Sequence, residues 1–206
     1  MSNGAYAAAY EQSITDPTTF WGNAAKAVEW ITEPTTVLDD TNPPFYRWFR
    51  GGTLHTCFNA LDRHVLAGRG GQAALIYDSP VTSTIETITY AELLDGALRL
   101  AAALRERGVK RGDRVAIYMD NTWPCVLSIF AVLLAGGVFL VINPQTKPDK
   151  LAFILDDSDA AVLLTDSHLA SSFGPVLANA HKLKSVICSG TWPIPAPAGK
   201  PSAPVE

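Results

Sequence analysis

The sequence has few charged residues and few cysteines for its length. Charged residues are 17% of the 206, below the roughly 25% of average globular domains, and 16 Lys and Arg against 20 Asp and Glu give a net charge of −4. These values exclude a disordered polyelectrolyte and a general basic surface for nucleic acid. Three dispersed cysteines, Cys57, Cys125 and Cys188, fit neither a disulfide framework nor a metal knuckle. They favour a reducing compartment, and we expect a cytoplasmic protein.

The common nucleotide-binding signatures are also missing. The glycine-rich segment 68–71 follows a predicted helix (59–67) and precedes a predicted strand. A phosphate loop has the opposite order, strand before helix, and continues into Lys and Ser or Thr. The segment therefore predicts a helix-to-strand turn. No G-x-G-x-x-G motif follows a predicted strand, which argues against a nicotinamide or flavin oxidoreductase.

The titratable residues form no catalytic or metal-binding signature. Asp62, Arg63 and His64 are adjacent, and consecutive helix residues point in different directions, so we expect a structural ion pair or cap there. The other histidines, His55, His168 and His181, are isolated and lack metal-ligand spacing. We expect Cys57 and Cys125 to be small buried hydrophobes, and Asp156, Asp157 and Asp159 to solvate a helix end.

The N-terminal region reads as a helical and extended arm. Asp16 and Pro17 suit the N-cap and first position of a helix that runs toward Val28. An extended, proline-containing segment follows, and then an aromatic run at 45–49. We expect these aromatic residues to hold the arm against the main domain; a ligand platform is the alternative.

From residue 73 onward, strand and helix patterns alternate. Two short strands (73–77 and 84–88) suggest a hairpin, and Thr89 with Glu92 forms a capping box that starts a helix. Alternation with short connections predicts an α/β fold: a parallel-rich sheet with flanking helices, incomplete at its edges, preceded by the arm. The further strands are predicted at 114–119, 138–142, 162–165 and 185–188, and the further helices at 123–135, 148–155 (with Thr146 as a cap) and 169–180.

One uncharged segment invites a membrane interpretation. Cys125 to Ile142 spans 18 residues without a charge, the lower limit for a bilayer-spanning helix. Gly136-Gly137 interrupts it, and a β-branched run follows. A buried helix-turn-strand is therefore favoured over a membrane span. The first ten residues contain no Lys or Arg, which argues against a signal peptide.

Five strings, taken together, carry a family resemblance. They are Asp16-Pro17-x-x-Phe20-Trp21, Arg47-Trp48-Phe49-x-Gly51-Gly52, Asn59-Ala60-Leu61-Asp62-Arg63-His64, Thr89-Tyr90-Ala91-Glu92-Leu93 and Gly112-Asp113-Arg114-Val115-Ala116. The first three resemble the N-terminal region of acetyl- and propionyl-CoA synthetases. The last two resemble the start of the adenylate-forming domain of the same AMP-forming acyl-CoA synthetases. The resemblance covers roughly residues 10 to 190.

The resemblance implies an enzyme that activates a small carboxylate. Such an enzyme uses ATP and Mg²⁺ to form an acyl-adenylate, releases pyrophosphate, and transfers the acyl group to coenzyme A. The family's Thr-Ser-Gly-rich, Lys-containing loop should follow the last strand, where this chain has Ser189-Gly190-Thr191-Trp192-Pro193. We therefore expect the N-terminal portion of a short-chain synthetase, cut before its ATP-binding loop and inactive alone. It would have no catalytic, cofactor-binding or metal residue of its own, no nucleic-acid partner and no membrane span.

Two segments depart from the short-chain pattern. Asn143-Pro144-Gln145-Thr146 stands where those enzymes have a Phe-Gly-Gly-Phe-like turn, and residues 167–172 lack the arginines that bind coenzyme A. In this half the chain resembles the broader acyl- and aryl-CoA ligases, so no binding residue is carried over from the short-chain enzymes.

The resemblance also predicts a domain organisation. Residues 1–70 would form the acetyl-CoA-synthetase-like N-terminal region, 71–190 the start of the AMP-binding domain, and 191–206 a proline-rich linker or tail. The alternative function is a stand-alone, non-catalytic module that binds acyl-CoA or a protein partner. Whether the reading frame continues past Glu206 would distinguish the two.

Overall fold

A computed structural model describes residues 4–190. The chain divides into two compact units, and the boundary between them along the sequence falls between Ala60 and Leu61. The predicted proline-rich tail lies outside the described residues.

The first unit contains two helices and a two-stranded antiparallel sheet. Asp16 caps the second helix as predicted, because its carboxylate accepts a hydrogen bond from the backbone N–H of Thr19 at 3.1 Å. The first helix was not predicted from the sequence. The elements are α1 (Ala5–Thr15), α2 (Pro17–Ala25), β1 (Thr36–Asp39) and β2 (Arg47–Arg50).

The aromatic residues of the first unit contact one another. The Trp48 ring lies edge-on to Trp21 with centroids 6.2 Å apart, and Trp30 lies 5.6 Å from Phe49. Such pairs add stability beyond the burial of their area. These residues therefore form a small aromatic cluster within the arm, and their contact with the main domain stays a prediction.

A helical segment spans the boundary between the units, and a hairpin follows it in the second unit. Two π-helical stretches, η1 (Phe58–Asp62) and η2 (Val65–Arg69), are followed by β3 (Ala73–Ser79) and β4 (Thr84–Thr89), which pair antiparallel. Gly68 has φ of +76°, a conformation that suits glycine. The helix-to-strand turn predicted for 68–71 is therefore confirmed.

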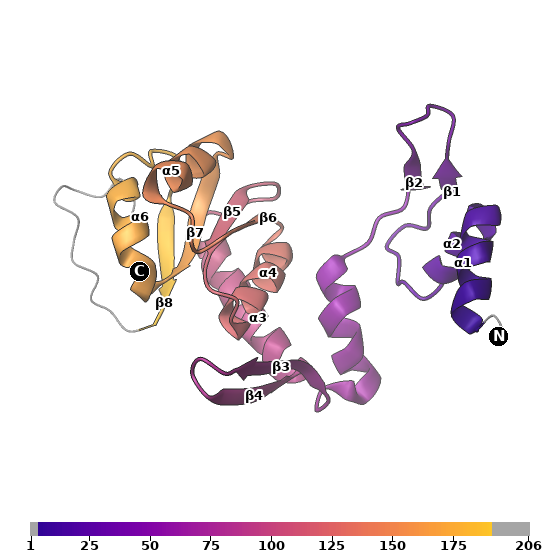
Figure 1. The fold of residues 1–206 in the computed structure, drawn as a ribbon, viewed down its shortest axis with the longest axis horizontal. Coiled ribbons are helices and arrows are strands. Elements are labelled where there is room, and N and C mark those ends of the chain that lie inside the picture. The colour runs from indigo at the N-terminus through magenta and orange to yellow at the C-terminus, as the bar shows by residue number, and fades with distance from the viewer. Residues whose placement is uncertain (1–3, 191–206) are drawn as a thin grey trace. The chain divides into compact units, whose positions relative to one another are not determined.

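Four parallel strands form the main sheet, in the order β6-β5-β7-β8, and helices lie on both of its faces (Figure 1). The predicted α/β fold with a parallel sheet and flanking helices is therefore confirmed. The strands are β5 (Arg114–Tyr118), β6 (Val138–Ile142), β7 (Ala160–Asp166) and β8 (Ser185–Ser189), and the helices are α3 (Tyr90–Glu106), α4 (Trp123–Ala135), α5 (Pro148–Asp157), η3 (Ser167–Leu169) and α6 (Ala170–Leu177).

Two apolar cores lie against the two faces of this sheet. Side chains alternate along β5, since Val115 and Ile117 belong to the core with α3 and α4, whereas Ala116 and Tyr118 belong to the core with α5 and α6. All four residues have 0% of their surface exposed. The alternation is that of a strand covered on both faces.

Two caps predicted in the second unit have different outcomes. The Thr89–Glu92 capping box of α3 is present. Thr146 does not cap α5, contrary to the prediction: the N-cap position is Lys147, which makes no side-chain cap hydrogen bond. The reason is that Pro148 occupies the first helical position, as proline prefers, which leaves Thr146 one residue too far from the helix.

The strand β6 is an open edge of the sheet. Val138, Phe139 and Val141 have 50%, 39% and 48% of their surface exposed, and among the described strands β6 pairs only with β5. The uncharged segment that contains it forms α4, a turn and β6. Within residues 4–190, no helix combines the length and the apolar character needed to cross a bilayer.

Candidate functional site

The carboxyl ends of the four parallel strands meet at one edge of the sheet, here called the carboxyl edge. Ligands of open parallel sheets bind outside this edge. The residues placed there are Asp120 to Trp123 after β5, Asn143 to Thr146 after β6, Asp166 to His168 at the end of β7, and Ser189 and Gly190 at the end of β8.

Asp166 joins three of these strand ends. It is the last residue of β7 and only 7% exposed. Its Oδ2 atom accepts a hydrogen bond from the backbone N–H of Asp120 at 2.9 Å, and its Oδ1 accepts one from the hydroxyl of Ser189. A buried carboxylate needs such donors to offset lost hydration. Asp166 is thereby fixed in one orientation.

His168 completes a cluster with the two aspartates. Its Nε2 atom lies 2.9 Å from Oδ2 of Asp120, in a pair that is half-exposed on both sides. One ligand atom from each of Asp120, Asp166 and His168 lies within 4.8 Å of the other two. We call these three residues the acid–imidazole cluster. The expectation that His168 is isolated was wrong, because the fold places the end of β7 beside the end of β5.

The cluster opens onto a groove of about 360 Å³. One wall comes from the β3–β4 hairpin, including Thr84 and Glu86, and the other from the carboxyl edge, including Thr122 and Trp123. None of the residues that line the groove is Lys or Arg. The groove is therefore acidic.

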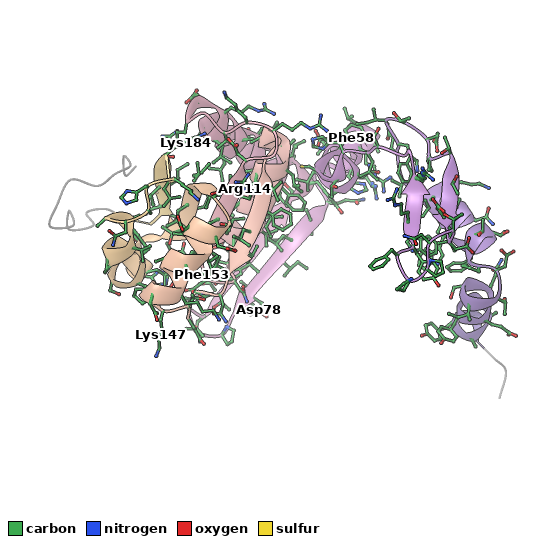
Figure 2. The ribbon with its side chains drawn as sticks, turned by 90° about the horizontal axis from the view of Figure 1, so that it is seen from above. Phe58, Asp78, Arg114, Lys147, Phe153 and Lys184 are labelled. Atoms are coloured by element: carbon green, nitrogen blue, oxygen red, sulfur yellow. The ribbon has the colours of Figure 1, made fainter. Side chains whose placement is uncertain are left out.

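The loop after β6 forms two neighbouring hollows of about 610 and 410 Å³. A core side chain holds this loop, because the hydroxyl of Tyr118 lies 2.7 Å from the carbonyl oxygen of Pro144 and 2.9 Å from that of Thr146. The smaller hollow is lined partly by Lys147 and Lys150. Figure 2 shows Lys147 at the same end of the sheet as Asp78 of the hairpin.

The cysteine thiols near this edge are held protonated. Burial, reinforced by the charge of Asp166, raises the pKa of Cys188 to about 11 and also raises the pKa of Cys125. A thiol with a raised pKa is a poor nucleophile at neutral pH. Cys57 and Cys125 are 0% and 6% exposed, so the prediction that they act as small buried hydrophobes is confirmed.

The residues around His64 lie elsewhere in the second unit. The imidazole hydrogen-bonds Arg69 and its ring centroid lies 4.8 Å from that of Tyr90. Partial burial, with the charges of Arg69 and Arg63, lowers the pKa of His64. His64 thus packs and hydrogen-bonds at the start of α3.

The acidic residues after α5 lie at the opposite end of the sheet. Asp159 pairs with Lys182 and, at 3.2 Å, with Arg114. Asp156 lies 3.7 Å from Lys182. Asp156, in the last turn of α5, and Asp159, just beyond it, therefore form surface ion pairs.

Known proteins match the chain in two consecutive segments. Residues 6–60 match the acetyl-coenzyme A synthetase N-terminus, and residues 62–204 match the AMP-binding enzyme family. The short-chain acyl-CoA synthetase family member 3 of Mus musculus, a mitochondrial protein, is 37% identical over 166 residues, which are 81% of this chain and 24% of that protein. An acetyl-coenzyme A synthetase of Streptomyces coelicolor is 40% identical over 159 residues, or 77% of this chain and 24% of that one.

The fold is also that of a solved relative. The acetoacetyl-CoA synthetase of Streptomyces lividans superposes with a TM-score of 0.78 at 25% identity, covering 100% of this chain and 32% of that one. The molecule is thus an α/β protein of the acyl-CoA synthetase type. The chain belongs to the AMP-binding enzyme family, and the resemblance to acetyl-CoA synthetases is confirmed. It spans about a quarter of the length of the curated relatives that it matches.

The acidic groove does not fit the phosphate-bearing ligands that this family implies. Glu86, Asp120 and Asp166 contribute carboxylates to it, and no lining residue is a permanent cation. ATP and coenzyme A would meet like charge there. We therefore assign no step of the family reaction to this groove.

Proposed function

We propose that this chain forms the N-terminal portion of an ATP-dependent, AMP-forming acyl-CoA synthetase for short-chain carboxylates. In that reaction a carboxylate oxygen attacks the α-phosphorus of ATP, and pyrophosphate leaves. The thiol of coenzyme A then attacks the acyl carbon, and AMP leaves. Residues 1–70 would supply the N-terminal region and residues 71–190 the start of the AMP-binding domain.

The observation that carries the proposal is the order of the two family matches. An acetyl-CoA synthetase N-terminus is followed directly by the AMP-binding family along one chain. The parallel sheet supports the same conclusion, since its carboxyl edge is where open α/β folds place their ligands. The relatives are named for acetyl, acetoacetyl and short-chain acyl groups, so a small carboxylate is the proposed substrate class.

A chimaera tests this function. This chain would replace the matching segment of the S. coelicolor acetyl-coenzyme A synthetase, whose identity to it is 40%, and carboxylate-dependent ATP–pyrophosphate exchange would be measured. We expect exchange from the chimaera and none from the 206-residue chain alone. A matched chimaera in which Gly96 becomes Leu is the control. A Cβ atom at Gly96 would lie 2.5 Å from Cδ1 of Leu127, and the larger side chain should disrupt the α3–α4 packing.

Two results would contradict the proposal. One is a folded chimaera that binds ATP but shows no exchange with any of acetate, propionate or acetoacetate. The other is exchange by the isolated chain, which would show that it is catalytically complete. Tight binding of acyl-CoA by the isolated chain would favour a non-catalytic binding module instead.

We also propose that the protein works in the cytoplasm. Its three cysteines are free, as expected in a reducing compartment. Cell fractionation with an antibody to the chain tests this location. Recovery with mitochondria would place it with the mitochondrial relative instead.

A further inference from the structure

The acid–imidazole cluster has the spacing of a metal site. Oδ2 of Asp120 and Nε2 of His168 lie 2.9 Å apart. Adjacent ligands of an octahedral cation with bonds of about 2.1 Å lie about 3 Å apart. Asp166 offers an oxygen within 4.8 Å of both atoms. A cation between the three would need only small side-chain movements.

The charge of the cluster is not balanced by protein groups. Two carboxylates face one imidazole, and Asp166 is 7% exposed. Among residues 4–190, Asp166 has no ion pair, and Asp120 pairs only with His168. No Lys or Arg lines the adjoining groove. Clustered carboxylates at a partly buried edge favour a bound cation.

The Asp166 side chain is also held from behind. The backbone N–H of Asp120 and the hydroxyl of Ser189 orient Asp166, in the way that outer hydrogen bonds orient metal-ligating carboxylates. The strand ends β5, β7 and β8 supply these groups. The groove in front leaves space for water or a further ligand at the remaining coordination positions.

We propose that Asp120, Asp166 and His168 bind a divalent transition-metal cation. Two carboxylate oxygens and an imidazole nitrogen suit Mn²⁺, Co²⁺ or Zn²⁺ better than the all-oxygen preference of Ca²⁺ or Mg²⁺. This site goes beyond the proposed ligase function. Binding of a cation by these three side chains requires neither ATP nor coenzyme A, so the proposal does not depend on the ligase function.

The test uses Mn²⁺ alone with the 206-residue chain. Free Mn²⁺ is measured by electron paramagnetic resonance during titration, and the bound ion is the difference. We expect one Mn²⁺ per chain, with affinity reduced by at least about tenfold in His168→Ala and Asp120→Asn. Both replaced side chains are half-exposed, so these variants should fold; circular dichroism checks this.

Matched controls separate a built site from general acidity. His181→Gln and Asp157→Asn remove an exposed imidazole and an exposed carboxylate outside the cluster, and both should bind Mn²⁺ like the parent chain. Failure of the parent chain to take up Mn²⁺, or equal weakening in the controls, would overturn the site. Because the measurement is of binding, its result is separate from that of the exchange assay.

Discussion

The two ends of the parallel sheet differ in how their charges are compensated. At the amino end, Arg114 donates to the carbonyl oxygen of Ser158 at 2.6 Å and pairs with Asp159, while Lys184 lies 3.4 Å from Asp113. Figure 2 shows Arg114 and Lys184 together at the end opposite Lys147. At the carboxyl end, His168 is the one basic side chain of the acid–imidazole cluster, and it pairs with Asp120.

The charged side chains at the two ends of the sheet therefore have different roles: those at the amino end stabilise the fold, and those at the carboxyl end are candidates for binding a ligand. At the amino end, Arg114, Asp159, Lys184 and Asp113 each have a protein partner of opposite sign. The carboxyl end keeps two partly compensated carboxylates beside an open groove. Uncompensated charge in a cleft is typical of a binding site. Three changes test this comparison of the two ends of the sheet, from the largest expected effect on stability to the smallest.

The largest effect is expected from Asp166→Ala. This change leaves the backbone N–H of Asp120 and the hydroxyl of Ser189 without their acceptor. We expect the free energy of unfolding to fall by about 1–3 kcal/mol, measured by urea denaturation without added metal. Asp157→Asn is the control for loss of a carboxylate and should change stability little. Unchanged stability in Asp166→Ala would mean that the carboxyl end is not held through this residue.

A smaller effect is expected from Arg114→Met at the amino end. It removes the hydrogen bond to Ser158 and the ion pair with Asp159. Because the side chain is 37% exposed, solvent weakens both interactions, and we expect a loss of about 1 kcal/mol. The exposed Arg111 provides the control, Arg111→Met. A loss larger than that of Asp166→Ala would reverse the comparison.

The smallest effect concerns pH and the aspartates at the amino end. The backbone N–H of Lys110 and the charge of Lys184 lower the pKa of Asp113, and the hydrogen bond and charge of Lys182 lower that of Asp159. Carboxyls with lowered folded pKa values stabilise the fold above their unfolded pKa of 3.8. That stability is lost as pH falls through the lower folded values.

Urea unfolding between about pH 2 and 6 measures this decline. The double variant Asp113→Asn/Asp159→Asn should show a shallower fall than the parent chain. Asp156→Asn, whose carboxylate lies 3.7 Å from Lys182, should leave the slope nearly unchanged. Equal slopes in parent and double variant would show that these pairs do not contribute.

The secondary structure of the second unit could be predicted because local signals mark its boundaries. The helix 123–135 and the strand 138–142 have the bounds that the sequence predicts, since Gly136 adopts a φ of +85° at the helix end and a β-branched run follows. In contrast, α1 has no buried residue and no side-chain cap. Neither an apolar face nor a cap was therefore available to predict it.

The acid–imidazole cluster could not be found from residue spacing. Asp120 and Asp166 are 46 positions apart, far beyond any metal-binding motif, and only the parallel pairing of β5 with β7 brings them together. A signal existed in the sequence: each aspartate lies at or just beyond the end of a predicted strand. Parallel strands bring such positions to the same edge, so listing the polar residues at strand ends would have identified the cluster.

Tyr118 connects the loop after β6 to the protein interior through hydrogen bonds from a buried side chain. Its ring is fully buried in the core beneath α5 and α6, and its hydroxyl holds the carbonyl oxygens of Pro144 and Thr146. A substitution that shifts this ring, such as a change of volume at Leu151, would move the wall of the 610 Å³ hollow. The position of this loop, and with it one wall of the hollow, therefore depends on side chains buried in the core.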